Sequence, residues 1–455
     1  MALFMESLDA TILNTGVPTI AKAFGVAPLS MKAALTSYTL SLAVFIPISG
    51  WMADRFGTRR VFFTAIGVFT VGSLLCGLSG GISSLVASRI LQGCGGALMV
   101  PVGRITLVRT FPKSELLRAT SFVAIPALIG PLVGPLVGGL IVVYSHWRMI
   151  FFVNLPMGVL GILLAIRYMP DFRAERRAPL DIVGLTLFGA GVALVSYVLE
   201  IFGEHSLTLK SELFLFGVGV SLLVAYALHS RRLKHPLLML DFFGIRTFRA
   251  SVVGSFITRL GVGGMPFLLP LLYQIGMGHS PVESGLLIMP QPLAAMGLRA
   301  FTTRILRALG YRRVLLVNTV CIGGAIMLFA AVGPGTGVWQ IALTSALLGF
   351  LSSLQFTSMN TLAYADLKDS QASMGATIAS TAQQMSMSFG VAVASLTTLV
   401  FVGGNRNPSD PGMVRGLHSA FLALGGFTMI SALIFWTLRS DDGAAVSRHR
   451  EHAMP

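Results

Sequence analysis

The sequence predicts an all-α membrane protein in which two six-helix bundles flank two extra central helices, giving fourteen transmembrane helices. Three observations support this fold class: the apolar composition, apolar runs of membrane-spanning length, and the concentration of Lys and Arg in the loops on one side of the membrane. Of 455 residues, 54% are hydrophobic and only 11% are charged, whereas an ordinary soluble domain has about 25% charged residues. Too few polar side chains remain to coat a soluble surface, so lipid must cover much of the chain.

The apolar runs define the expected spans. A transmembrane helix needs about 20 mostly apolar residues, and runs of that length occur as a group of six, a pair, and a second group of six. They lie at 2–21, 33–53, 61–80, 83–103, 119–143, 149–167, 181–200, 211–229, 250–273, 282–302, 313–333, 337–360, 375–402 and 417–438. The expected domains are an N-terminal six-helix bundle (1–167), a linker with two additional helices (168–235), and a C-terminal six-helix bundle with a cytoplasmic tail (236–455).

The loop charges test this count. Of the 33 Lys and Arg residues, 25 fall in loops on one side, which the positive-inside rule makes cytoplasmic. Both termini are therefore expected in the cytoplasm, with the chain in the inner (plasma) membrane. The exceptions are Lys22, Lys32, Arg148, Lys210, Arg406 and Arg415 on the opposite side, with Arg89 and Arg259 inside spans.

The net charge of +15 thus reflects topology and does not indicate nucleic-acid binding, which would require a basic face on one soluble domain. The first segment has no basic n-region and no cleavage site, so it predicts a retained span and not a signal peptide.

An internal repeat indicates transport. The sequences GTRRV at 57–61 and GYRRV at 310–314 each follow the second span of a six-span group. Repeated halves with a site between them at mid-membrane are typical of secondary transporters. The sequence has no HExxH or P-loop pattern, and its three cysteines lie singly in apolar runs. These patterns predict neither an enzyme nor a metal or cofactor site, and leave a passive channel as the alternative from another class.

A motif joins spans two and three on the cytoplasmic side. Residues 50–60 read GWMADRFGTRR, and Asp54 could accept hydrogen bonds at a helix N-terminus and pair with an Arg, latching the two halves in one state. The alternative is a solvated loop Asp among topology-setting charges. In the second repeat Arg307 takes the place of Asp54, so a single acidic latch is expected. The predicted latch residues are Gly50, Asp54, Arg55, Gly57, Arg59 and Arg60.

This loop resembles the signature loop of the major facilitator superfamily. Residues 8–14 (LDATILN) with Pro18, residues 89–96 (RILQGCGG) and residues 147–158 (WRMIFFVNLPMG) are similar to motifs of its fourteen-span drug:proton antiporters. Residues 130–139 (GPLVGPLVGG) resemble the antiporter motif of the fifth span. That motif comprises Gly130, Pro131, Gly134, Pro135, Gly138 and Gly139. Small faces and prolines there suit a helix that packs closely and bends, although ordinary membrane packing would need the same residues.

The resemblance implies multidrug efflux driven by the proton motive force: small amphipathic compounds leave across the inner membrane in exchange for protons. The partners are then a small-molecule substrate, protons and the lipid bilayer, with an outer-membrane or periplasmic adaptor left open. The alternative with the same fold is a proton-coupled exporter or importer of one specific metabolite.

The first span carries the candidate coupling carboxylates. Asp9 and Glu6 are three residues apart and share a helical face. Burial disfavours the charged form of a carboxyl, so such a group can take up and release protons. Arg89 lies inside span four and should face a partner such as Asp9, because an unpaired guanidinium is costly in lipid. We predict that Asp9, Arg89 and Glu6 couple transport to protons; purely structural hydrogen bonds are the alternative.

Substrate contacts are predicted from polar, Met and Phe residues within spans, since adaptable Met and Phe walls suit a polyspecific pocket. Arg259 has no acidic residue in its own span, so it should reach Asp9 or Glu6 across the halves or contact an anionic substrate. Contact with lipid or neighbouring helices is the alternative for the others. The candidates are Asn14, Arg259, Met265, Phe267, Met289, Gln291, Phe356, Met359, Asn360, Gln383, Gln384 and Met387.

Overall fold

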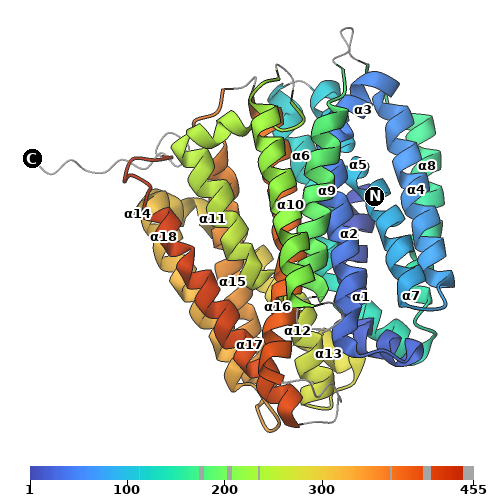
Figure 1. The fold of residues 1–455 in the computed structure, drawn as a ribbon, viewed down its shortest axis with the longest axis vertical. Coiled ribbons are helices and arrows are strands. Elements are labelled where there is room, and N and C mark those ends of the chain that lie inside the picture. Colours follow the sequence, from blue (N-terminus) through green and yellow to red (C-terminus); the bar gives the residue numbers. More distant parts are fainter. Residues whose placement is uncertain are drawn as a thin grey trace, which may run out of the picture. The chain divides into compact units, whose positions relative to one another are not determined.

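The computed structural model describes residues 1–111, 113–173, 179–201, 208–233, 236–368, 371–402 and 411–443, and all regular secondary structure within these ranges is helical (Figure 1). The predicted cytoplasmic tail from residue 444 lies outside them. The helices are α1 (Ala2–Phe24), α2 (Lys32–Phe45), α3 (Ser49–Phe56), α4 (Thr58–Leu78), α5 (Ile82–Thr110), α6 (Lys113–Tyr144), α7 (Met149–Phe152), α8 (Asn154–Tyr168), α9 (Ile182–Ile201), α10 (Leu209–Ser230), α11 (Arg246–Val262), α12 (Met265–Leu271), α13 (Pro281–Ile288), α14 (Pro290–Leu328), α15 (Val338–Ala363), α16 (Ala372–Val402), α17 (Pro411–Ile430) and α18 (Ala432–Phe435).

Shorter helical turns connect or extend these helices. They are η1 (Pro28–Met31), η2 (Ile46–Ile48), η3 (Leu240–Gly244), η4 (Leu272–Gly276) and η5 (Phe329–Ala331).

Every predicted span coincides with helix. Within the described residues, 11 helical segments are long and apolar enough to cross a membrane. The predicted spans at 2–21, 119–143 and 282–302 fall outside that criterion, yet α1, α6 and the run from α13 into α14 cover them. The helices are therefore consistent with fourteen spans, and the chain is a multi-pass membrane protein.

The chain divides into two compact units. Unit 1 comprises residues 1–238 and 278–286, and unit 2 comprises residues 239–277 and 287–455. The inserted helices α9 and α10, in green in Figure 1, pack on each other within unit 1, and α9 also packs on α2. The proposed division of the chain at residues 167 and 235 stays a prediction.

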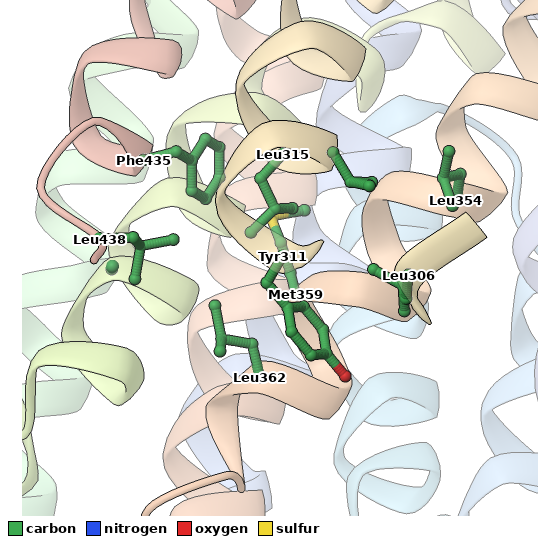
Figure 2. Close-up of a cluster of buried hydrophobic side chains, with 10 residues drawn as sticks. Leu306, Tyr311, Leu315, Leu354, Met359, Leu362, Phe435 and Leu438 are labelled. Carbon is green, nitrogen blue, oxygen red and sulfur yellow. The ribbon is translucent and has the colours of Figure 1, made fainter. Parts of the chain in front are cut away.

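Unit 2 has an apolar core where α14, α15 and the end of the chain's last helix meet. Figure 2 shows the side chains of this cluster converging between the helices, with the Tyr311 hydroxyl at its edge, where it donates to Thr361 Oγ1 at 3.0 Å. Between membrane helices such packing stabilises the unit through van der Waals contacts. The cluster contains Ala250, Leu306, Tyr311, Val314, Leu315, Leu354, Met359, Leu362, Phe435 and Leu438.

The internal repeat reappears in the backbone. Gly57 lies at φ 94°, ψ 143°, between α3 and α4, and Gly310 lies at φ 73°, ψ 163°, where it interrupts α14. Both conformations lie close to a region that is essentially restricted to glycine. The two GxRRV sequences therefore turn the chain in the same way within their own units.

Candidate functional site

Asp9 is positioned by close packing of α1 against α6. The glycines Gly130, Gly134 and Gly138 recur every four residues, so they lie on one face of α6. A Cβ atom at these positions would overlap Ser7, Thr11 and the carbonyl oxygen of Ile12, respectively. Three glycines of the predicted antiporter motif thus let α1 approach the backbone of α6.

The Asp9 carboxylate forms a buried ion pair. Arg89 Nη1 of α5 donates to Asp9 Oδ2 at 2.6 Å, and each of these side chains is only 1% exposed. In a low-dielectric environment each charge is tolerable only because the other compensates it. The structure therefore brings together two of the predicted coupling residues.

Two amides complete the coordination of Asp9. Gln92 Nε2 and Asn154 Nδ2 donate to Asp9 Oδ1 at 2.9 and 3.1 Å. Both amides also donate to Ser73 Oγ, at 3.3 and 3.0 Å, and Ser73 in turn donates to the carbonyl of Phe151. The charged form of Asp9 thus has donors on both of its oxygens.

Arg89 is fixed by contacts beyond the ion pair. Its Nε donates to the carbonyl of Ala34 at 3.2 Å, and its Nη1 also donates to Gln92 Oε1 at 2.7 Å. The guanidinium carbon lies 4.2 Å from the centre of the Tyr38 ring, a cation–π contact. Glu6 lies one turn before Asp9, and its buried Oε2 has no hydrogen-bond partner within the described part of the chain.

The predicted latch residues lie in α3, in the turn after it and at the start of α4 in unit 1. Asp54 of α3 accepts from Arg109 Nη2 of α5 at 3.0 Å, and both side chains are about two-fifths exposed. An ion pair at that exposure contributes at most about 1 kcal/mol. A Cβ atom at Gly50 would meet no atom of unit 1 within 4 Å. The side chains of Arg55 and Arg60 are exposed.

The N-terminus of α4 is bound by the segment after α8. Asp171 accepts from the backbone N–H of Arg59 at 3.2 Å and pairs with Arg173 at 3.1 Å. The Thr58 hydroxyl donates to the carbonyl of Pro170 and accepts from the N–H of Phe172. Asp171 therefore lies where a carboxylate complements the positive end of a helix.

The other side of the α6 motif meets α13. A Cβ at Gly139 would lie 2.5 Å from the carbonyl oxygen of Pro281, and one at Gly285 would lie 2.5 Å from that of Pro135. These contacts lie within unit 1, to which residues 278–286 belong. Helix α6 thus connects the Asp9 helix to α13.

The candidate substrate residues of unit 2 are only partly brought together. Met359, Asn360 and Gln383 line one small pocket, and Arg259 and Phe356 stack one helical turn away from it. Arg259 lies 7% exposed on α11, and its Nε donates to Ser255 Oγ at 3.0 Å. Since Asp9 is engaged by Arg89, an Asp9–Arg259 pair would require an exchange of partners.

The remaining candidates lie elsewhere. Met265 and Phe267 are fully buried within α12, and Met289 and Gln291 are half-buried at the start of α14. Asn14, in unit 1, donates to the carbonyl of Ala10 at 3.4 Å, a bond of marginal length. Gln384 and Met387 are half-buried on α16 beside the pocket residue Gln383 but do not line it.

Sequence reasoning assigned no role to Gln92, Asn154, Ser73 or Asp171. Gln92 and Asn154 stood inside recognised motifs, and an amide in an apolar span is a signal of its own because lipid offers it no partner. Asp171 followed a span without any pattern that could have identified it. Within the described residues, no group of three or more His, Cys, Asp and Glu side chains could hold a metal ion.

Comparison with known proteins decides the family. The family model described as Major Facilitator Superfamily matches residues 1–391. The chain belongs to the major facilitator superfamily. The expected resemblance is confirmed, as is the expectation of a transporter and not an enzyme.

Curated relatives place this facilitator near the MdtD proteins. It is 38% identical over 453 residues to "Putative multidrug resistance protein MdtD" of Escherichia coli O7:K1 (strain IAI39 / ExPEC), which covers 99% of this chain and 96% of that protein. The protein of the same name from Shigella flexneri serotype 5b (strain 8401) matches with the same identity and coverage.

Solved structures confirm the facilitator fold. The peptide-family transporter PepTSo superposes with a TM-score of 0.69 at 15% identity, covering 99% of this chain and 98% of its own. A bacterial homologue of the lysosomal transporter Spinster gives a TM-score of 0.69 at 14% identity, covering 99% and 97%. At these identities the likeness shows the fold alone.

Proposed function

We propose that this facilitator is a proton-driven exporter of small amphipathic compounds, including drugs, across the cell inner membrane, with both termini in the cytoplasm. Two observations support the proposal. The near full-length relatives are named as multidrug resistance proteins. The buried Asp9–Arg89 pair supplies a group that a proton can switch.

The switch follows from competition for one carboxylate. Arg89 and a proton cannot both occupy Asp9 Oδ2, so protonation removes the compensation for the buried guanidinium. Loss of one partner of a buried pair costs about 3–5 kcal/mol. That free energy is sufficient to shift a conformational equilibrium by several orders of magnitude. Glu6, whose Oε2 is buried without a donor, is the second candidate proton carrier.

The latch residues and the α6 motif would transmit the conformational change that follows protonation of Asp9. Residues Gly50 to Arg60 cover most of α3, the turn at Gly57 and the start of α4. Asp54 of α3 pairs with Arg109 of α5. Helix α6 contacts both α1 and α13 through its glycines. A displacement of α1 upon protonation would therefore act directly on α6.

A carrier for one specific metabolite is the second candidate function. The buried cation Arg259 beside a polar pocket favours it, because a fixed charge selects among substrates more strongly than an apolar wall does. An adaptor partner in the periplasm or outer membrane stays a prediction.

Efflux of chemically unrelated dyes from cells expressing the chain tests the proposal, with Asp9→Asn as the variant. Efflux by the wild type should collapse with an uncoupler. We expect Asp9→Asn to lose at least about a hundredfold of the uncoupler-sensitive rate, as when an essential proton carrier is removed. Asp241→Asn, an exposed carboxylate in η3, is the matched control and should retain efflux.

Protein level in the membrane is measured for each variant, so that loss of protein is separated from loss of coupling. Uncoupler-sensitive efflux that persists in Asp9→Asn would rule out Asp9 as the carrier. Absence of efflux for every dye with wild-type protein present would favour the single-metabolite carrier.

A further inference from the structure

Arg259 is a buried cation in unit 2 that forms no ion pair with the carboxylates of the described residues. It lies 7% exposed in α11, and none of the described carboxylates approaches it within 4.0 Å. This differs from Arg89, whose charge is compensated by Asp9 at 2.6 Å. An intramembrane guanidinium without a counter-ion is costly and indicates a functional site.

Two contacts orient the Arg259 side chain. Its Nε donates to Ser255 Oγ at 3.0 Å, and its guanidinium carbon lies 3.8 Å from the centre of the Phe356 ring. Stacking on an aromatic face holds the guanidinium plane but leaves its net charge in place. The group is therefore held in a fixed orientation while its charge lacks a counter-ion.

A pocket of hydrogen-bonding side chains adjoins this cation. Ser251 and Ser255 of α11, Asn360 of α15 and Gln383 of α16 line it. Ser255 also accepts from Arg259, so the pocket and the guanidinium share a residue. In this conformation the pocket has room for about one water molecule, so a substrate would enter only after these helices move apart.

We propose that the transported substrate carries an anionic group, a carboxylate, sulfonate or phosphate, that binds Arg259 with the Asn360 and Gln383 amides as further donors. The proposal rests on the proposed transport function and names its substrate class. A guanidinium binds such groups with two parallel hydrogen bonds. The apolar side chains of Val252 and Met359, which line the same pocket, suit an apolar or aromatic body. An amphipathic cation would be repelled by the same site.

Binding to the purified full-length chain in detergent tests this assignment with three probes of matched shape: 2-naphthoate, 2-naphthamide and 2-naphthylmethylammonium. Isothermal titration gives each affinity, and a ligand-dependent rise in the unfolding temperature gives an independent measure. We expect 2-naphthoate to bind at least about tenfold more tightly than the amide and the cation.

Variants of the arginine separate charge from packing. Arg259→Gln should abolish the preference for 2-naphthoate. Arg259→Lys should keep part of it, because the ammonium retains the charge but not the planar fork. Arg249→Gln, an exposed position on the same helix, is the matched control and should bind as the wild type does.

If Arg259→Gln does not fold, Asn360→Leu and Gln383→Leu test the same site, and each should weaken 2-naphthoate binding more than binding of the cation. The assignment is overturned if the cation binds as tightly as the anion, or if the preference for the anion survives in Arg259→Gln.

Asp9→Asn distinguishes this proposal from the transport proposal. The variant should bind 2-naphthoate with unchanged preference although its proton-driven efflux is lost. If the wild type binds the anion selectively but exports nothing under a proton gradient, the transport proposal fails while the assignment of the anion site stands.

Discussion

Asp9 accepts hydrogen bonds from Arg89, Gln92 and Asn154, which come from α5 and α8. These donors stabilise the charged carboxylate inside the bundle. A neutral carboxyl would be a weaker acceptor for the same three donors. Loss of the charge would therefore disturb the contacts of α1 with α5 and α8 together.

Tyr38 beneath Arg89 provides a prediction about stability. Its hydroxyl is buried with no hydrogen-bond partner among the described residues, so Tyr38→Phe should change the free energy of unfolding by less than about 0.5 kcal/mol. Tyr38→Leu loses the cation–π contact and should cost about 1–2 kcal/mol. Chemical unfolding of both variants in detergent is the measurement. An equal loss of unfolding free energy in Tyr38→Phe and Tyr38→Leu would show that the hydroxyl, and not the ring face, forms the stabilising contact.

Asp442 provides a prediction about pH. It accepts from Arg246 Nε and Nη2 at 2.9 and 2.5 Å and from the N–H of Arg439 at 2.8 Å. Burial alone would raise the pKa of the Asp442 carboxyl, but the hydrogen bonds led by Arg246 outweigh burial and hold that pKa below its ordinary value. A lowered folded-state pKa means that the stabilisation is present above the unfolded pKa, about 4, and is lost as pH falls through the folded value.

Asp442→Asn should therefore lower the free energy of unfolding by about 1.5 kcal/mol at pH 7. The difference from wild type should shrink as the pH falls below about 4. Thermal unfolding across this pH range measures it, with the adjacent exposed Asp441→Asn as control. A difference of the same size at both ends of the range would contradict the assigned role of the carboxylate.

Helix α6 lies between two neighbours that approach its backbone. Its glycine row faces α1, and the following Gly139 faces α13. Because backbone carbonyl oxygens face Gly138 and Gly139, the helices cannot adjust at these two positions by side-chain rotation alone. In a closely packed interior, such an arrangement transmits small displacements instead of absorbing them.

Two glycines of α6 should respond differently to alanine. At Gly138 the new methyl group would overlap the carbonyl oxygen of Ile12, which cannot rotate away, whereas at Gly134 its nearest atom would be the rotatable hydroxyl of Thr11. We expect Gly138→Ala to destabilise by about 2–3 kcal/mol and Gly134→Ala by clearly less. Thermal unfolding and dye efflux measure both effects. Gly217→Ala on α10, where nothing lies within 4 Å, is the control, and equal effects at 134 and 138 would contradict the backbone argument.

The helices were largely predictable because apolar run length reports membrane helices directly. The breaks inside these helices were not predicted. Pro47 in η2, for example, separates α2 from α3 within the single expected span at 33–53. The Asp9–Arg89 proximity followed from the cost of isolated charge in lipid. The contacts of the Gln92 and Asn154 amides with Asp9 could not be predicted, because the three residues lie on helices whose packing no local sequence pattern specifies.

For the molecule as a whole, the inserted helices α9 and α10 bind the segment that leads into unit 2. Asp181 Oδ2 accepts from the N–H of Leu237 at 3.2 Å, while its Oδ1 lies 2.9 Å from His229 Nε2 and accepts from the N–H of Gly184. The Tyr226 hydroxyl accepts from the N–H of Leu238 at 2.8 Å and donates to its carbonyl. The inserted pair thus has a structural role at the junction between units.

Hydrogen exchange resolved to single amides tests this clamp. Asp181→Ala should remove the protection of the Leu237 amide while leaving that of Leu238 largely intact, and Tyr226→Phe should do the reverse. Each variant is the control for the other. If both amides exchange at the wild-type rate in both variants, these hydrogen bonds do not hold the segment.

The clamp has a mechanical consequence. Unit 1 ends at Leu238, the residue that Tyr226 binds, and unit 2 begins at Met239. The chain is therefore held within unit 1 up to the last residue before this crossing, so the first free backbone torsions are those of Met239 and η3. A crossing fixed in this way leaves few residues free to reorient, where a long unbound linker would leave many.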